Sequence, residues 1–476
     1  MKSVLSAYGY SALSFFLNFI AIFVYIRIAG FQGYGAYSIY LILMGMLVLL
    51  ETSLVKAALA MHARAGGAAD SARVGVERFI LSHILILALA CVPLTVLGDY
   101  VFPADAATGV GGSFVMVVVL AESALSAPFN QLTFRLTLAK RFATIYAWRL
   151  TATFVRHICA WTALLLTGSV RYAIVAVVIK GAIVGGGSLL AMRRDDGGVR
   201  PVRALAQPAS WVHYLALAQI FLTATLLLVI REAPSAYVSR IYGQTIFGVY
   251  RTFYDLVNPV WFIGAVYPTM LFTFFLPRDG RLDRAQAAAK FEPLAYKLAL
   301  FHLCYAAAVS TLISGEILFS GRIFPQMPFA YGVVGGICLM GYNNFLLEAA
   351  QAFGLLFRAL GAIMATLAVV IGVLFFGPRL DNAGEIAYVW VVSQLLLLVL
   401  LRGLLFLEAF DARAGSLLEV LVLGAPVAVI VALNNRIPTP ALFAITASLA
   451  LISGGFFLYS IKDDIAGLLT PKTRSA

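Results

Sequence analysis

The sequence predicts an all-α membrane protein with about fourteen transmembrane helices. Of its 476 residues, 62% are hydrophobic and only 12% are charged, whereas a soluble domain carries roughly 25% charged residues. The apolar runs are continuous over roughly 20 to 30 residues, while a strand of a membrane barrel would have about ten residues and alternate. Because backbone amides cannot remain unpaired in hydrocarbon, runs of this length must form helices.

Successive apolar segments place these helices along the chain. Six precede a polar stretch at 192–210, six follow it, and a final pair is joined only by residues 434–438. Most segments exceed the roughly 20 residues that cross a bilayer. In chain order, the helices are expected at 8–28, 36–62, 79–102, 112–136, 142–168, 171–192, 211–241, 249–275, 293–320, 327–352, 355–377, 385–408, 416–433 and 438–461.

An internal repeat relates the two halves of the chain. Residues 27–37 read RIAGFQGYGAY and residues 240–250 read RIYGQTIFGVY, so Arg, Ile, Gly, Gly and Tyr recur at an offset of 213 positions. Both copies join the first span of their half to the second. The glycines permit a tight turn between antiparallel helices, and the tyrosines suit the aromatic belt at a membrane surface.

The repeat divides the chain into lobes. Its offset covers six spans, an even number, so the two copies cross the membrane in the same direction and form a parallel repeat. The expected parts are an N-lobe at 1–192, a cytoplasmic linker at 193–210, a C-lobe at 211–408, and two extra helices with a cytoplasmic tail at 409–476. Transporters built from two such lobes bind their substrate between them and alternate access by rocking.

The basic residues predict the orientation of the chain. With the N-terminus inside, the inner segments hold about three times as many Lys and Arg residues as the outer segments, in agreement with the positive-inside rule. Both termini are therefore expected in the cytoplasm. The inner loops also account for most of the formal net charge of +12, so nucleic acid is not an expected partner.

The sequence contains no motif that indicates an enzyme or a cofactor site. It has no P-loop, no HExxH motif and no Cys/His cluster with metal-ligand spacing. The four cysteines each lie in an apolar run and are expected to pack as small hydrophobic residues. Short outer loops argue against a membrane polysaccharide polymerase or ligase. The chain is therefore expected to act without catalysis and without a bound cofactor or metal.

Cationic side chains inside the spans indicate an anion-binding site. An ionisable residue in hydrocarbon is costly and is usually functional. Arg156 is mid-span and shares a face with Arg149, and Lys180 is central in the next span. Such cations suit a phosphate, although they could instead pair with Glu51 or Glu122, or snorkel to an interface. The expected substrate-binding residues are Arg156, Arg149, Lys180, Lys56, Arg231 and Arg251.

Three carboxylates inside spans are the candidates for coupling transport to an ion gradient. Glu51, Glu122 and Asp255 lie where a carboxylate can take up a proton or hold Na⁺. Each has a structural alternative, since a carboxylate in hydrocarbon can equally pair with a neighbouring cation. Asp255, for example, lies on the same helix face as Arg251, which is four residues before it.

Two long segments resemble polysaccharide flippases of the multidrug/oligosaccharidyl-lipid/polysaccharide exporter superfamily. Residues 27–59, RIAGFQGYGAYSIYLILMGMLVLLETSLVKAAL, are similar to the opening of these proteins, with an Arg–x–x–Gly turn and a Gly–x–Tyr motif. Residues 233–268, APSAYVSRIYGQTIFGVYRTFYDLVNPVWFIGAVYP, resemble their second lobe. The expected fourteen spans, in a six-plus-six-plus-two pattern, also fit this family. One departure is that Arg231 stands beside Glu232, where the family often carries an acidic residue alone.

The resemblance implies a function in polysaccharide biosynthesis. Such a flippase moves an undecaprenyl-pyrophosphate-linked oligosaccharide (for O-antigen, capsule or exopolysaccharide) between the leaflets of a bacterial cytoplasmic membrane. A proton or sodium gradient or the membrane potential would drive it, and other polysaccharide-assembly membrane proteins are possible partners. The first alternative is an ion-coupled multidrug exporter of the same superfamily, which would need an acidic, aromatic cavity. The second is the polymerase or ligase named above.

Overall fold

The computed structural model describes most of the helical part of the chain. It covers residues 2–64, 80, 84, 92–196, 211–258, 284–314, 327–352, 355–376, 380, 383–409, 444–455 and 459. Nearly all of these residues are helical, which confirms the all-α prediction. Seven described helices are long and apolar enough to cross a membrane. The expected span at 416–433 and most of the expected linker lie outside the described residues.

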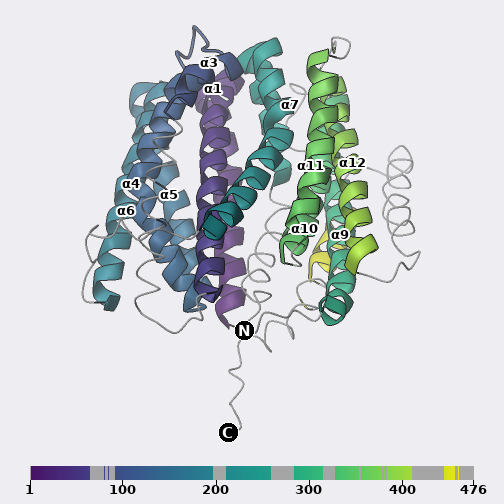
Figure 1. The fold of residues 1–476 in the computed structure, drawn as a ribbon. Coiled ribbons are helices and arrows are strands. Elements are labelled where there is room, and N and C mark those ends of the chain that lie inside the picture. Colours follow the sequence, from purple (N-terminus) through teal and green to yellow (C-terminus); the bar gives the residue numbers. More distant parts are fainter. Residues whose placement is uncertain are drawn as a thin grey trace. The chain divides into compact units, whose positions relative to one another are not determined.

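The chain forms two compact units. The first, Leu5–Thr252, is called the N-unit here, and the second, Phe253–Ala476 with Met1–Val4, is called the C-unit. The N-unit contains most of α1 (Lys2–Arg64) and of α7 (Trp211–Val257), and all of α3 (Leu94–Val101), α4 (Gly112–Leu138), α5 (Phe142–Thr167) and α6 (Val170–Asp196) (Figure 1).

The C-unit is built around α10 and α12. Its described helices include α9 (Arg284–Ser314), α10 (Met327–Ala352), α11 (Leu356–Ile371), which a π-helical turn continues to Phe376, and α12 (Ala383–Ala409). A shorter apolar helix, Ala444–Gly455, follows them. α10 packs on α9 and α12, and α11 packs on α12. Gly336 of α10 allows this approach, because a Cβ there would lie 2.7 Å from the buried ring of Trp390. Close helix contacts through glycine are a common solution in membrane bundles.

The repeated glycines turn the chain without a loop. α1 and α7 each contain two predicted spans and run through a single non-helical residue, Gly30 in α1 (φ 68°, ψ −178°) and Gly243 in α7 (φ 78°, ψ 173°). This combination of angles is accessible almost exclusively to glycine. Gly30 and Gly243 are equivalent positions of the repeat, so the structure confirms the hairpin turns that the sequence predicts there.

The two hairpins also contact each other through equivalent residues. A Cβ on Gly35 would overlap the carbonyl oxygen of Gln244 and lie 3.1 Å from the nitrogen of Gly248. A Cβ on Gly248 would overlap the carbonyl oxygen of Phe31 and lie 3.0 Å from the nitrogen of Gly35. Each glycine therefore admits the backbone of the other hairpin at the same relative position, and the contact has local two-fold symmetry. We call it the glycine seam.

A second close contact joins α4 and α6. Gly181 lies against the backbone of Glu122, since a Cβ there would be 2.7 Å from the Glu122 carbonyl oxygen, and Gly185 lies against the Leu125 carbonyl in the same way. The contact brings Lys180, beside Gly181, next to α4.

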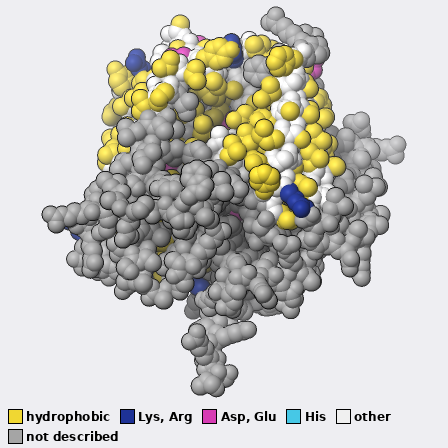
Figure 2. Space-filling view, viewed as in Figure 1, with side chains coloured by type: hydrophobic (Ala, Val, Ile, Leu, Met, Phe, Trp, Pro, Cys, Tyr) yellow, Lys and Arg dark blue, Asp and Glu magenta, His cyan; other side chains and the backbone are white. Residues whose placement is uncertain are grey.

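The exposed surface of the described helices is apolar, as expected for a multi-pass membrane protein. On α5 the side chains of Phe154, Ile158 and Leu165 are 51%, 44% and 69% exposed. Hydrophobic side chains likewise cover much of the described surface in Figure 2. A water-soluble protein rarely exposes contiguous apolar faces of this extent, because they drive association. These helices therefore face lipid.

Candidate functional site

Polar side chains gather in the interior of the N-unit, and we call them the polar cluster. They come from both arms of α1 and from α4, α5 and α6. A buried polar group is costly unless it is hydrogen-bonded, so each member has to be accounted for. The members are Asn18, Tyr40, Glu51, Glu122, Ser123, Asn130, Arg156, His157 and Lys180.

Lys180 and Glu122 form a buried ion pair. Lys180 Nζ bonds Glu122 Oε1, and Tyr40 donates its hydroxyl to Glu122 Oε2 at 2.9 Å. The Glu122 side chain is fully buried and Lys180 is only 9% exposed, so both charges have left water. The pairing follows from the glycine contact between α4 and α6. It neutralises one predicted cation and one predicted coupling carboxylate, which makes a structural role the simplest reading of both.

Glu51 is held differently, by neutral donors. Ser123 donates its hydroxyl to Oε1, and Asn130 donates Nδ2 to Oε2 at 3.0 Å. Ser123 and Asn130 are seven residues apart and therefore lie on one face of α4. Within the described part of the chain, no basic side chain lies within ion-pair distance of Glu51. A buried carboxyl group in this setting can gain or lose a proton without breaking an ion pair.

Arg156 has no carboxylate partner among the described residues. It donates Nη2 to Asn18 Oδ1, and His157 Nε2 lies 2.9 Å from the same oxygen and 3.3 Å from Arg156 Nη2. The imidazole of His157 stacks on Trp161, with ring centroids 5.2 Å apart. Arg156 Nε, His157 Nδ1 and Trp161 Nε1 are all buried without a hydrogen-bond partner in the described structure.

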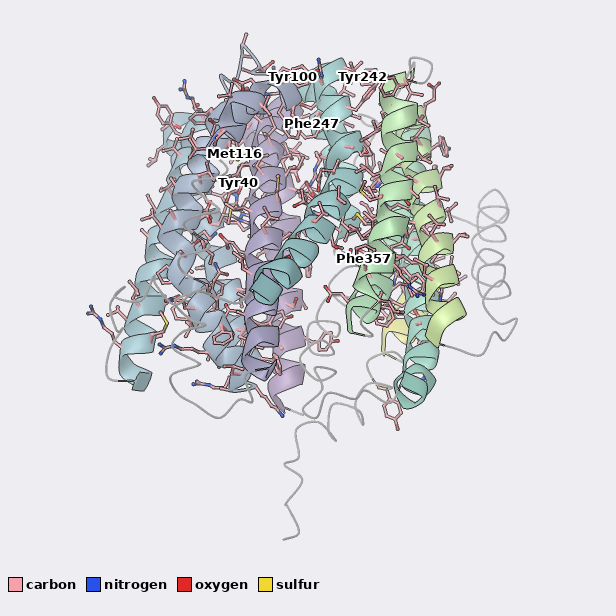
Figure 3. The ribbon with its side chains drawn as sticks, viewed as in Figure 1. Tyr40, Tyr100, Met116, Tyr242, Phe247 and Phe357 are labelled. Carbon is pink, nitrogen blue, oxygen red and sulfur yellow. The ribbon has the colours of Figure 1, made fainter. Side chains whose placement is uncertain are left out.

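A column of tyrosines lines the α1 hairpin within the same unit. Tyr25, Tyr37 and Tyr40 are buried; the Tyr25 and Tyr37 rings stack at 4.0 Å, and Tyr37 and Tyr40 lie 5.4 Å apart. The hydroxyls of Tyr25 and Tyr37 have no hydrogen-bond partner in the described structure. Figure 3 shows Tyr40 farther into the bundle than Tyr100, which lies at the end where α3 sits. The column adds aromatic faces and hydroxyl groups to the interior.

Three other predicted cations, Arg149, Arg231 and Arg251, lie outside the polar cluster. Glu232 joins the two arms of the α7 hairpin, because it lies 2.7 Å from Arg231 Nε on its own arm and 3.1 Å from Arg251 Nη1 on the other. Arg251 Nη1 is also 3.4 Å from Ser235 Oγ. The guanidinium of Arg149 lies 5.1 Å from the centroid of the Tyr146 ring.

The two remaining predicted residues are less informative. Asp255 is half-buried near the end of α7, and the side chain of Lys56 lies outside the described residues. The structure thus brings together Arg156, Lys180, Glu51 and Glu122 from the predicted set. Sequence reasoning missed Asn18, Ser123 and Asn130, whose signal was only that of polar residues within apolar spans.

In chemical terms, the described part of the cluster offers the Arg156 guanidinium and the Glu51 carboxyl group, both without an ion-pair partner, together with several hydrogen-bond donors and aromatic faces. Charge-assisted donors of this kind bind oxygens of phosphate or carboxylate groups, and aromatic rings pack on apolar faces of ligands. No group of His, Cys, Asp and Glu suited to a metal ion occurs among the described residues. The surroundings of Arg156 therefore suit an oxygen-rich organic anion.

Solved membrane transporters share this fold. The lipid II flippase MurJ, in an inward closed conformation, aligns with a TM-score of 0.62 and 10% identity over 98% of this chain and 99% of its own. A multidrug resistance MATE family transporter of the MOP superfamily, in an outward-facing conformation, aligns with a TM-score of 0.58 and 13% identity over 85% of this chain and 94% of its own. The Vibrio cholerae MATE transporter VcmN aligns with a TM-score of 0.55 and 13% identity over 86% of this chain and 99% of its own.

Similarity at such low identity establishes the fold alone. No protein-family model and no curated protein matches the chain significantly.

Proposed function

We propose that the protein is a flippase for an undecaprenyl-pyrophosphate-linked oligosaccharide and that it works by alternating access. The observation that carries this proposal is Arg156, a guanidinium inside the N-unit whose described partners are all neutral. Arg156 is half-buried, and a cation partly withdrawn from water with only neutral hydrogen-bond partners is well suited to an anion that arrives. The fold shared with MurJ and the MATE transporters supports transport, and MurJ is itself named as a lipid II flippase.

The proposed roles follow from the partners of each residue. Arg156 would contact the pyrophosphate, while His157, Trp161 and the tyrosines would offer donors and aromatic faces to the sugars. Arg149, Lys56, Arg231 and Arg251 remain proposed secondary contacts, and Lys180 is assigned to the ion pair with Glu122. The lipid tail would stay in the bilayer throughout.

Glu51 is the proposed coupling residue, and Asp255 is a second proposed one. Its neutral donors let Glu51 change protonation without breaking an ion pair. A membrane potential of 100 mV supplies about 2.3 kcal/mol per charge moved, which is enough to bias the direction of transport. We place the protein in a bacterial cytoplasmic membrane with both termini inside, and with lobes at 1–192 and 211–408, a linker between them and two extra helices after 408.

Glu51 also favours a second candidate function. A carboxylate with no basic partner among the described residues is a feature that an organic-cation exporter requires. That function would place the cargo on Glu51 and leave Arg156 as a repulsive charge. The two functions therefore predict opposite effects for substitutions at these two positions.

A reconstitution experiment separates the two functions. Purified protein in liposomes is given a fluorescent undecaprenyl-pyrophosphate oligosaccharide, and protection from an external quencher reports flipping. We expect flipping by wild type and by Arg156→Lys, and at least tenfold slower flipping by Arg156→Gln, because glutamine keeps a donor but loses the charge. Flipping that Arg156→Gln leaves unchanged would remove Arg156 from the site. Ethidium export that Glu51→Gln abolishes, with no flipping by wild type, would favour the cation exporter.

A further inference from the structure

The last residues of α3 and the segment that joins it to α4 form a knob, which we define as residues 99–111. Its base is closed by backbone hydrogen bonds from Phe102 N to Gly98 O and from Gly112 N to Phe102 O, both 2.8 Å. Gly98 and Gly112 are in such close backbone contact that a Cβ on either would overlap the other. At the tip, Asp105 N donates to Val110 O at 3.2 Å. The knob is therefore pre-organised by its own backbone.

The carboxylate of Asp105 ties the knob to the first hairpin. Asp105 Oδ2 accepts hydrogen bonds from the backbone nitrogens of Ala107, at 3.1 Å, and Thr108, at 2.9 Å. The same oxygen accepts Gln32 Nε2 at 3.0 Å, just after the Gly30 turn of α1. One side chain thus shapes the tip and holds it on α1.

The knob is also bonded to the second hairpin, in α7. Thr108 donates Oγ1 to Gln244 Oε1 at 2.9 Å, and Gln244 returns a hydrogen bond from Nε2 to the Val110 carbonyl at 2.7 Å. Gln244 is buried, so its whole amide group is committed to the knob. Two aromatic contacts with α7 flank these bonds.

Both flanking contacts come from the rim of the knob. The guanidinium of Arg240 lies 4.0 Å from the centroid of the Tyr100 ring, and the rings of Phe102 and Phe247 are 6.1 Å apart. Figure 3 shows Tyr100 and Phe247 at the same end of the N-unit, where α3 lies. Gln244 itself belongs to the glycine seam, because its carbonyl oxygen meets Gly35. The knob therefore covers the seam and contacts both hairpins.

We propose that the knob is a latch that holds the glycine seam closed, and that transport requires its release. The chain itself joins the knob to the half that contains α1, and Gln32 adds a hydrogen bond to that half. Interactions of side chains join it to α7, namely the hydrogen bonds with Gln244, the contact with Arg240 and the ring contact with Phe247. When the seam opens, the knob would stay with α1, and these interactions with α7 would break. The inference rests on the proposed alternating access and does not depend on the identity of the cargo.

A cysteine reporter beneath the seam tests the latch without any cargo. Ser38 is fully buried and lies three residues after Gly35, on the same side of α1. Ser38→Cys, in a background without the native cysteines, should react with an impermeant maleimide only when the seam opens. The fraction of sealed vesicles with the knob on the outside is measured separately with Ala106→Cys. This position of the knob is exposed, so the impermeant maleimide labels it wherever the knob faces outward.

Thr108→Val is the test variant and Thr108→Ser is its matched control. Valine has nearly the same shape as threonine and loses the hydroxyl that bonds Gln244, whereas serine keeps it. Losing one such hydrogen bond should raise the open fraction, and with it the labelling rate, about three- to tenfold, while Thr108→Ser should label as wild type does. Arg240→Leu, compared with Arg240→Lys, should act in the same direction.

The outcomes separate the latch from the proposed function. The latch would be overturned if the labelling rate were equal in Thr108→Val and Thr108→Ser and also equal in Arg240→Leu and Arg240→Lys. Faster labelling of Thr108→Val in a protein that flips no lipid-linked sugar would support the latch and count against the proposed cargo. The elution volume and the thermal unfolding of each variant show whether faster labelling arises from a loss of folding instead.

Discussion

Removal of the Lys180 ammonium should destabilise the protein strongly. Lys180→Met keeps the length and apolar stem of the side chain but leaves Glu122 without its counter-ion. Because the Glu122 side chain is fully buried, water cannot replace the lost partner. The consequence is a carboxylate without a counter-ion in the core of the N-unit. The protein must then protonate this group, admit water to it or unfold.

The magnitude follows from what remains around Glu122. Breaking a buried ion pair from one side costs about 3–5 kcal/mol. The Tyr40 hydroxyl still donates to Glu122 at 2.9 Å and stabilises the orphaned charge, so the expected loss is about 3 kcal/mol, at the lower end of that range. Adding Glu122→Gln removes the orphaned charge, and the double variant should recover to within about 1 kcal/mol of wild type.

Arg156→Met is the matched comparison. Its described hydrogen bonds go to Asn18 and His157, and Asn18 keeps His157 when the guanidinium is lost. No carboxylate is orphaned, so the expected loss of stability is about 1 kcal/mol or less.

Unfolding free energies can be measured by titrating the mole fraction of SDS in mixed micelles. A Lys180→Met variant as stable as wild type would refute the reasoning. So would a double variant as unstable as Lys180→Met alone, because the ion pair would then not be the source of the loss.

Two further predictions concern the glycine seam and the coupling residue. Gly248→Ala places a methyl group on the Phe31 carbonyl and should lower the unfolding free energy by about 1–3 kcal/mol. Gly45→Ala is the control: its methyl group would have nothing within 4 Å, so it should raise the unfolding free energy by about 0.5 kcal/mol. Equal SDS midpoints for the two variants would contradict the close contact at the glycine seam. Glu51→Gln keeps the shape of the side chain and should unfold like wild type to within about 1 kcal/mol, yet its transport in liposomes should no longer respond to an imposed pH gradient. A retained response would leave Asp255 as the proposed coupling residue.

Much of the fold could be predicted from the sequence because apolar runs in lipid leave the backbone few choices. The expected helix at 327–352 agrees with α10, and those at 112–136, 142–168 and 171–192 lie within a few residues of α4, α5 and α6. The repeat predicted turns at Gly30 and Gly243, and the structure has them. The sequence could not show that one glycine suffices for each turn, since the flanking residues carry no helix-stop signal.

The candidate site was less predictable because its pairs depend on packing between helices. Lys180 and Glu122 are 58 residues apart and meet only because Gly181 lets α6 approach α4. Sequence reasoning offered that pair as an alternative to anion binding but could not choose between them. Neutral partners such as Asn130 and Asn18 were missed, since an amide in an apolar span gives no indication of what it contacts.

The glycine seam has the form of an interface between two copies of one chain. Gly35 and Gly248 are equivalent repeat positions and touch each other, so the contact is self-complementary, as in an isologous dimer. A half-length ancestor carrying one such hairpin could have paired with a second copy through the same surface. Gene duplication and fusion would then have preserved the interface while freeing each half to diverge. The knob bonds the two hairpins through different side chains, so this part of the contact does not follow the repeat.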